Sequence, residues 1–190
     1  RGNGIYAFGV DKLNRKLFYT VDADRLILGN SDVNSCGELA EYNVHSGVSD
    51  NIWALTQGPG EEFWFGSMTS GNVVKRVNNI SSIPGVAPNY TDFPKDAGDG
   101  VRTGPFADDT RDIFWDSSGD AMWLGQAEAV SRYVRQYLAI TPFWFNMNKA
   151  NFVLDSNLAA VRAVGVYNGS GGQKTIWLAT DKGVYRMKNY

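Results

Sequence analysis

The chain alternates short apolar runs with tight polar turns, and this alternation is typical of antiparallel β-sheet. A recurring unit contains an apolar strand, a polar turn, a second strand centred on an aromatic residue, and a third strand with apolar and basic residues. The unit is clearest in residues 111–125 and 129–134. A helix is disfavoured there by Gly125 and by the alternation around Arg132. The pattern therefore predicts an all-β chain.

The pattern occurs four times, in units that span residues 1–50, 51–110, 111–160 and 161–190. Aligning the copies superimposes one aromatic residue of each second strand: Phe18, Trp64, Trp123 and Trp177. Three arginines superimpose in the third strand: Arg76, Arg132 and Arg186. A period of about 45–55 residues with roughly four strands per unit is typical of a β-propeller blade. We therefore predict one propeller-like domain over residues 1–190, with the aligned aromatic residues in its core.

The units resemble propeller repeats of the two-component-regulator type, whose blades carry a pattern like D-x-x-G-x-x-W-x-G-T followed by G-x-x-R. The third unit matches this pattern at Asp116, Gly119, Trp123 and Gly125. The fourth unit matches it at Trp177, Thr180, Gly183 and Arg186. The resemblance implies a propeller fold, and it implies a sensor segment of a larger receptor as one possible function.

The second unit, over residues 55–66, also resembles a streptogramin-lyase-type blade. Enzymes of that type use histidines and a metal ion at the centre of the ring. The single histidine of this chain, His45, lies outside any matching motif. We therefore do not carry the lyase activity over, although a propeller-type carbohydrate-active or lyase-like enzyme remains an alternative.

The number of units departs from both families, whose propellers usually have more than four blades. The fourth unit reaches only three residues beyond Met187, which leaves no room for a fourth strand. We therefore expect either a small, loosely closed propeller or part of a larger ring. An unpaired sheet edge would allow another chain, or a second copy, to add a strand.

Composition narrows the function classes. The chain has 190 residues, of which 13% are aromatic and 21 are glycine, a mixture typical of turn-rich β proteins. A formal net charge of −2 gives no general attraction for nucleic acid or an anionic membrane surface. No apolar run is long enough for a transmembrane helix. The lone Cys36 cannot form an internal disulfide or a zinc site.

Three tripeptides fit the acceptor pattern for N-glycosylation, and their asparagines are Asn79, Asn89 and Asn168. All three fall in stretches that the pattern predicts to be loops, where an acceptor must be accessible. They favour a secreted or extracellular glycoprotein.

The candidate ligand-binding residues are aromatic residues outside the core alignment and one arginine of the long insertion: Trp53, Trp115, Trp144 and Arg102. Exposed aromatic rings can stack on sugars or anchor a protein partner. The insertion, over residues 78–109, is where we expect specificity to lie. The aligned arginines could form a basic ring for an anion, although ion pairs between blades or surface positions are favoured.

No catalytic residue is predicted, because the chain has no nucleophile elbow, no P-loop and no dinucleotide fingerprint. Oxygen-rich loops can bind Ca²⁺, and the insertion contains several aspartates, but their spacing does not fit an EF-hand. These aspartates are Asp92, Asp96, Asp99, Asp108 and Asp109. We predict no metal site and no cofactor.

These observations together predict a non-enzymatic, extracellular recognition or assembly module built on a β-propeller. Its partner would be a protein or a glycan. Self-association through an open sheet edge is a further expectation.

Overall fold

The computed structural model is all-β, as the alternation of apolar and polar residues predicted, and its described residues include a 3₁₀ turn at Ser170–Gly172. Within residues 5–43 it describes the strands and their register, and for most residues from 52 onward it also describes side chains. None of the described helices could span a membrane. The structure describes residues 5–11, 16–21, 25–30, 38–43, 52–60, 62–67, 72–78, 89–96, 104–137, 141–148 and 160–188.

The described strands form four antiparallel sheets, each a meander in which strands that are consecutive in the sequence pair with each other. The first sheet contains β1 (Ile5–Asp11), β2 (Lys16–Val21), β3 (Arg25–Asn30) and β4 (Glu38–Asn43). The second contains β5 (Ile52–Gln57), β6 (Phe63–Ser67), β7 (Asn72–Val77) and β8 (Tyr90–Pro94). The third contains β9 (Thr110–Asp116), β10 (Ala121–Gln126), β11 (Ala129–Tyr137) and β12 (Thr141–Asn148). The fourth contains β13 (Val161–Asn168), β14 (Lys174–Thr180) and β15 (Gly183–Lys188).

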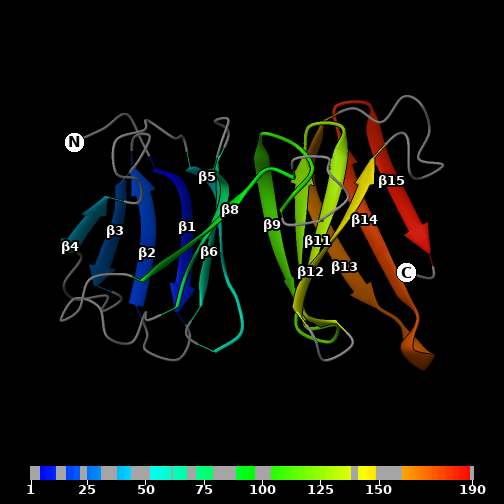
Figure 1. Ribbon diagram of the computed structural model, residues 1–190, viewed down its shortest axis with the longest axis horizontal. Coiled ribbons are helices and arrows are strands. Elements are labelled where there is room, and N and C mark those ends of the chain that lie inside the picture. Colours follow the sequence, from blue (N-terminus) through cyan, green and yellow to red (C-terminus); the bar gives the residue numbers. More distant parts are fainter. Residues whose placement is uncertain are drawn as a thin grey trace.

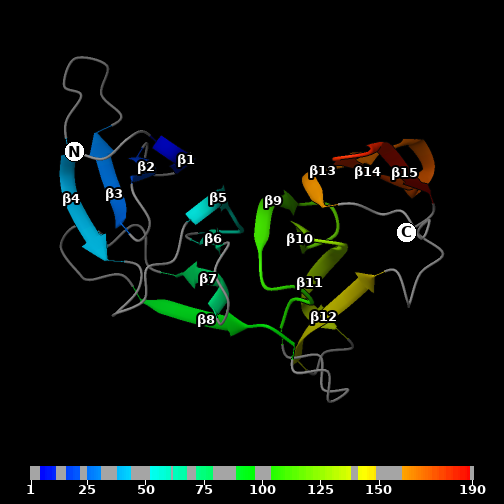
Figure 2. The same cartoon turned by 90° about the horizontal axis from the view of Figure 1, so that it is seen from above.

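The first strand of each sheet lies on the inner side of the molecule. Strand β1 contacts β5, β5 contacts β9, and β9 contacts β13. The sheets stand side by side (Figure 1), and from above they follow an open arc with these four strands on its inner side (Figure 2). The later strands of each sheet lie progressively farther out. This is the radial arrangement that the repeat predicted.

The core lies between neighbouring sheets. Trp64 of the second sheet packs in one cluster with residues of the third sheet, among them Met122, Leu124 and Tyr133. Trp123 of the third sheet packs in the next cluster with Ile176 and Leu178 of the fourth. The third and fourth sheets therefore each cover the tryptophan of the sheet that precedes them.

The aligned arginines lie directly opposite the aligned tryptophans in the antiparallel register. Arg76 pairs with Trp64, and Arg132 pairs with Trp123. Each guanidinium carbon lies over the ring of its partner, at 5.6 and 5.2 Å from the ring centroid. Arg186 lies over Trp177 in the same way, at 5.7 Å. The arginines thus form cation–π contacts within their own sheets. The sequence analysis favoured ion pairs between blades or surface positions: Arg76 forms an ion pair with Glu62, just before β6 of its own sheet, at 3.7 Å, and Arg186 is exposed.

The prediction that all the aligned aromatic residues are core residues is wrong for Trp177. Trp64 and Trp123 are each 1% exposed, whereas Trp177 is 43% exposed. The reason is that Trp64 and Trp123 are covered by a following sheet, whereas Trp177 belongs to the last described sheet. This sheet has three described strands.

The long insertion contributes to the second sheet. Its residues 90–94 form β8, the outer strand that pairs with β7. Asp96 and Pro105 are then joined by a backbone hydrogen bond of 2.8 Å, and residues 104–109 lead the chain back to the inner strand β9. The segment thus forms the outer strand of the second sheet and also connects the second sheet to the third.

A small residue near the end of the second strand allows the next sheet to approach. A Cβ atom on Gly66 would lie 2.5 Å from Thr110 Cγ2, and one on Gly125 would lie 3.0 Å from Val161 Cγ1. Both neighbours belong to the first strand of the following sheet. The glycine of the W-x-G sequence therefore sets how closely two inner strands can pack.

We expect Gly66→Ala to destabilise the fold by about 1–3 kcal/mol, because the added methyl group overlaps Thr110 and its carbonyl oxygen. Gly165→Ala is the matched control, since a Cβ atom there meets nothing within 4 Å. The control should change the free energy of unfolding by less than about 1 kcal/mol. Chemical denaturation measures both values, and equal stability of the two variants would contradict the packing argument.

A buried carboxylate ties the third sheet to the fourth. Asp116 Oδ2 accepts a hydrogen bond from Lys174 Nζ at 2.5 Å, and Asp116 Oδ1 accepts bonds from the Ser118 backbone N–H and hydroxyl. Burial alone would raise the pKa of Asp116, but these bonds and the Lys174 charge outweigh it and lower the pKa below its ordinary value. The ionised form therefore stabilises the folded state.

The contribution of Asp116 should be complete above the ordinary pKa of aspartate, about pH 4, and should be lost as the pH falls through the lowered value. In Asp116→Asn we expect lower stability at neutral pH and a smaller further loss of stability with acidification in this range. Asp108→Asn serves as the control, because its ion pair with Lys95 is exposed. Unfolding curves measured between neutral pH and pH 2 test this, and identical acid profiles for Asp116→Asn and the unsubstituted protein would refute it.

Candidate functional site

The four inner strands share one irregularity, a bulge at the same register position. In each case two neighbouring residues of the second strand pair with residues that lie two positions apart on the first strand, so the first strand carries one extra residue. These extra residues are Tyr6, Trp53, Arg111 and Arg162. We call these four positions the axial ring.

Bulges redirect side chains and are common at the rims of barrels and beside functional sites. Here each bulge lies opposite the end of the second strand, which is Gly66–Ser67 in the second sheet and Gly125–Gln126 in the third. Because the inner strands lie side by side, the repetition places the four positions near the same end of these strands, one in each sheet. The axial ring is therefore a consequence of the repeat itself, and its residue types differ from sheet to sheet.

Trp53 is the exposed aromatic residue of the ring. It lies on β5 between Ile52 and Ala54, which are buried in the core, while its own side chain is 44% exposed. The two buried neighbours fix the backbone at Trp53 before any ligand arrives. Such a residue can anchor a partner with little loss of conformational entropy.

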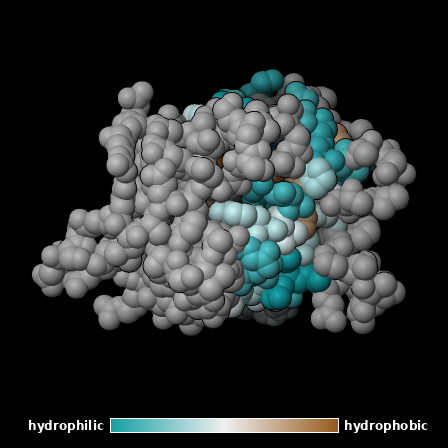
Figure 3. All heavy atoms as spheres, turned by 60° about the vertical axis from the view of Figure 1, so that its left-hand side comes forward, coloured by the Kyte–Doolittle hydropathy of each residue, from teal (hydrophilic) through white to brown (hydrophobic). Residues whose placement is uncertain are grey.

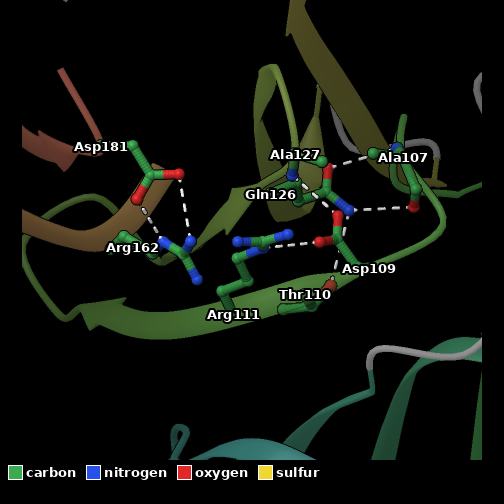
Figure 4. A network of polar contacts seen from close by, with 8 residues as sticks. All are labelled: Ala107, Asp109, Thr110, Arg111, Gln126, Ala127, Arg162 and Asp181. Atoms are coloured by element: carbon green, nitrogen blue, oxygen red, sulfur yellow. Dashed lines mark hydrogen bonds and ion pairs between the residues drawn. The ribbon is translucent and has the colours of Figure 1, made fainter. Parts of the chain in front are cut away.

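Arg111 is held by a carboxylate of the segment that precedes β9. Its Nε atom donates to Asp109 Oδ2 at 2.6 Å, and both side chains are largely buried. Asp109 also accepts a bond from the Ala127 N–H at 2.7 Å, so its carboxylate joins the start of β9 to the turn after β10 (Figure 4). Arg111 is therefore a fixed group of the ring.

Gln126 supports this arrangement from the end of β10. Its side-chain amide donates to the Ala107 carbonyl at 3.2 Å and accepts from the Ser131 hydroxyl at 2.6 Å. Both Gln126 and Ser131 are fully buried. This network fixes the segment from which Asp109 reaches Arg111 (Figure 4).

Arg162 forms a more exposed pair with Asp181, which lies in the turn between β14 and β15. Arg162 donates from Nε to Asp181 Oδ1 at 2.6 Å and from Nη2 to Oδ2 at 3.0 Å. About half of each side chain is exposed. The Arg162 guanidinium lowers the pKa of the Asp181 carboxyl group, which is therefore ionised at neutral pH. Arg111 and Asp109 also act electrostatically on this pair.

The described part of the ring thus combines one exposed aromatic surface with two arginines, each already paired with an aspartate. Within each pair the positive charge of the arginine is largely cancelled by the negative charge of the aspartate. The site therefore offers hydrogen-bonding groups and a flat apolar surface, and only a weak electric field. This chemistry suits recognition of a ligand that has both apolar and hydrogen-bonding groups.

The predicted ligand-binding residues lie in different parts of the molecule. Trp53 belongs to the axial ring. Trp144 is 2% exposed and lies in the core between the second and third sheets, so its expected surface position is wrong. Trp115 is partly buried and packs against the same core cluster. Arg102 lies outside the described residues.

Trp144 is buried because it lies on β12, opposite Tyr133 in the register, and its ring centroid lies 5.1 Å from that of Tyr133. The third sheet thus buries a second large aromatic side chain, on its outer strand β12. The sequence alignment predicted only one buried aromatic residue in each unit. Of the acceptor asparagines, Asn89 and Asn168 are exposed, and Asn79 lies outside the described residues.

The aspartates of the insertion do not converge. Asp92 pairs with Lys75 at 2.6 Å, and Asp108 pairs with Lys95 at 2.8 Å. Asp96 Oδ2 accepts a bond from the Asn146 side-chain amide at 2.9 Å. Within the part of the chain that the structure describes, no group of three or more histidine, cysteine, aspartate or glutamate residues could hold a metal ion. Asp99, Cys36 and His45 lie outside this part.

The sequence analysis did not identify Arg111, Arg162 or their aspartates as site residues. The available signal was an arginine near the start of the first strand, at the position where the other sheets carry Tyr6 and Trp53. Without the register this signal cannot be distinguished from an ordinary exposed strand residue.

Comparison with known proteins decides the fold. Three solved structures match essentially the whole chain: U3-55K (TM-score 0.61, 12% identity), a nidogen/laminin complex (0.62, 12%) and Sqt1 from Chaetomium thermophilum (0.61, 13%). The fold is a β-propeller. The matches cover 99–100% of this chain but only 53%, 60% and 44% of the other chains, so the propeller arc described here spans about half their length.

No family model and no curated protein matches the sequence. At identities of 12–13% the structural matches establish the propeller fold alone. The resemblance to two-component-regulator-type and streptogramin-lyase-type repeats therefore stays a prediction as to repeat type.

Proposed function

We propose that this propeller is a non-enzymatic recognition module, and that it binds a protein partner at the axial ring. The observation that carries the proposal is the repeated bulge, which places Trp53, Arg111 and Arg162 at corresponding positions of neighbouring inner strands. A framework that repeats its backbone and varies its side chains at one position is well suited to recognition.

The residue types favour a polypeptide ligand. Tryptophan and arginine are the residues most enriched at the energetic centres of protein interfaces. Trp53 offers an apolar surface, and the Arg162–Asp181 pair offers an exposed donor and an exposed acceptor next to each other. A segment with one large apolar side chain and hydrogen-bonding backbone groups matches both.

The described residues on the face shown in Figure 3 are mainly hydrophilic, with few hydrophobic residues among them. One of the comparisons supports a protein partner. One of the matched propellers was solved as a complex of nidogen with laminin, which is an example of protein recognition on this fold.

The test is a selection of binding peptides from a phage-displayed random library on the immobilised protein, followed by affinity measurements. We expect Trp53→Ala to weaken the selected peptides by about 10-fold or more, as for an interface anchor. The control is Tyr167→Ala, which removes a 63% exposed aromatic side chain from the other end of an inner strand. If the selected peptides bind Trp53→Ala and Tyr167→Ala equally well, the binding site lies away from Trp53.

A glycan ligand would give a different result in the same experiment. Tryptophan can also stack on a sugar ring. If no peptide is selected and a glycan array shows binding that depends on Trp53, the proposed partner class is wrong while the proposed site is retained. If Trp53→Ala retains both peptide binding and glycan binding, the proposed site is wrong.

The proposal includes an extracellular location, supported by the acceptor sequences for N-glycosylation. Asn89 and Asn168 are exposed, so an oligosaccharide could be attached without unfolding the sheets. When the protein is expressed through a eukaryotic secretory pathway, we expect glycosidase treatment to lower its mass. An Asn89→Gln/Asn168→Gln variant should show a smaller decrease, and no decrease in the unsubstituted protein would count against glycosylation.

A further inference from the structure

Two arginines of the axial ring come together at the junction of the third and fourth sheets. Arg111 is the extra residue of β9, and Arg162 is the extra residue of β13. These strands are in contact, and the Asp112 carboxylate accepts a hydrogen bond of 2.7 Å from the Val164 backbone N–H. In Figure 4 the guanidinium group of Arg111 points toward that of Arg162. The electrostatic effect of Arg111 on Asp181, the partner of Arg162, agrees with this proximity.

The neighbouring aspartates use only some of the N–H groups of these arginines. Asp109 accepts from Nε of Arg111, and Asp181 accepts from Nε and Nη2 of Arg162. Within the part of the chain that the structure describes, no acceptor is bonded to Nη1 or Nη2 of Arg111 or to Nη1 of Arg162. The Arg111 side chain is 18% exposed, and N–H groups removed from water without an acceptor cost free energy. A ligand that brings an acceptor to this point would therefore form hydrogen bonds that the described residues do not supply.

The geometry of these donors favours a carboxylate group. Nη1 and Nη2 form the outer edge of the planar guanidinium group of Arg111, and their parallel N–H groups match the two oxygens of a carboxylate. Nη1 of Arg162 adds a donor from the neighbouring sheet. A carboxylate accepts up to about four hydrogen bonds, so one group can serve all three nitrogens, which a single carbonyl oxygen with two lone pairs cannot do.

The two arginines differ in how firmly their aspartates hold them. The Asp109 side chain is 11% exposed and also accepts a hydrogen bond from the Ala127 N–H, so Arg111 is held in place. The Arg162–Asp181 pair is about half exposed, and an ion pair in contact with water adds little stability. Arg162 can therefore exchange Asp181 for a carboxylate of a ligand with little effect on the stability of the fold.

We propose that Arg111 and Arg162 bind a carboxylate group of the protein partner, and that Asp181 competes with this group for Arg162. This inference rests on the proposed function, because it assigns one chemical group to the partner that the axial ring recognises. The carboxylate belongs to an acidic side chain of the partner or to its C-terminal end. Two arginines and two aspartates carry no net charge together, so directed hydrogen bonds and not long-range attraction select the carboxylate.

Arrays of short synthetic peptides of random sequence test the inference. Each peptide is prepared twice, with a free carboxyl end and with an amide end, and the arrays are probed with the unsubstituted protein. We expect the bound peptides to lose about 10-fold in affinity when their carboxylate is replaced by an amide. A loss on replacing an acidic side chain by its amide identifies a side-chain carboxylate, and a loss on amidation of the end identifies a C-terminal carboxylate.

Three exposed positions of the protein give matched variants. Arg162→Gln should weaken the bound peptides by about 10-fold, because it removes donors to the carboxylate. Asp181→Asn should strengthen their binding by about 2- to 5-fold, because it removes the competing carboxylate. Lys182→Gln is the control: it removes the same charge as Arg162→Gln from an exposed neighbour of Asp181, and it should change affinity by less than about 2-fold. Circular dichroism confirms that each variant retains its β-structure before affinities are compared.

The outcomes separate this inference from the proposed function. If Trp53→Ala weakens the bound peptides while Arg162→Gln does not, the axial ring is retained and the carboxylate site is wrong. If Arg162→Gln weakens them while Trp53→Ala does not, the carboxylate site is retained and the aromatic anchor is wrong. Equal losses in Arg162→Gln and Lys182→Gln, or peptides that tolerate the loss of their carboxylate, overturn the inference. Weaker binding to Asp181→Asn overturns the competition, and arrays without any bound peptide contradict both proposals.

Discussion

The structure depends on one repeated contact, in which a sheet covers the tryptophan of the sheet before it. Trp64 and Trp123 each have an arginine of their own sheet over the ring and apolar residues of the next sheet around them. A single meander cannot bury both of its faces, so every sheet is stabilised by its neighbours. Burial of one indole side chain removes about 150–250 Å² from water, so each contact is worth several kcal/mol.

The same contact positions the candidate site. The close approach of Gly66 to Thr110 and of Gly125 to Val161 brings neighbouring inner strands together, one residue before each bulge. The bulged residues are thus spaced by the packing of the core. The residue types at these positions can vary without a change in the backbone, because the core clusters between the sheets do not include them.

Sequence analysis predicted the features that repeat. The four units, the all-β class and the core positions of Trp64 and Trp123 followed from alternation and alignment. The features that depend on neighbours could not be predicted in this way. Trp144 and Trp177 have similar sequence surroundings, yet one is buried by a neighbouring sheet and the other has no described sheet beyond it. The axial ring was also missed, because a bulge depends on the register of two strands and not on the composition of either.

The meander topology has a consequence for how the chain is made. Every described strand pairs only with its neighbours in the sequence, so each sheet can form as soon as its own residues are available. Domains that emerge from the ribosome acquire structure from the N-terminal end. A nascent propeller of this kind would therefore expose one tryptophan-bearing face at a time, and synthesis of the next sheet would remove that face from solvent. Because each new sheet covers the exposed apolar face of the sheet before it, the sequential arrangement of the repeats limits the apolar surface that is available for aggregation during synthesis.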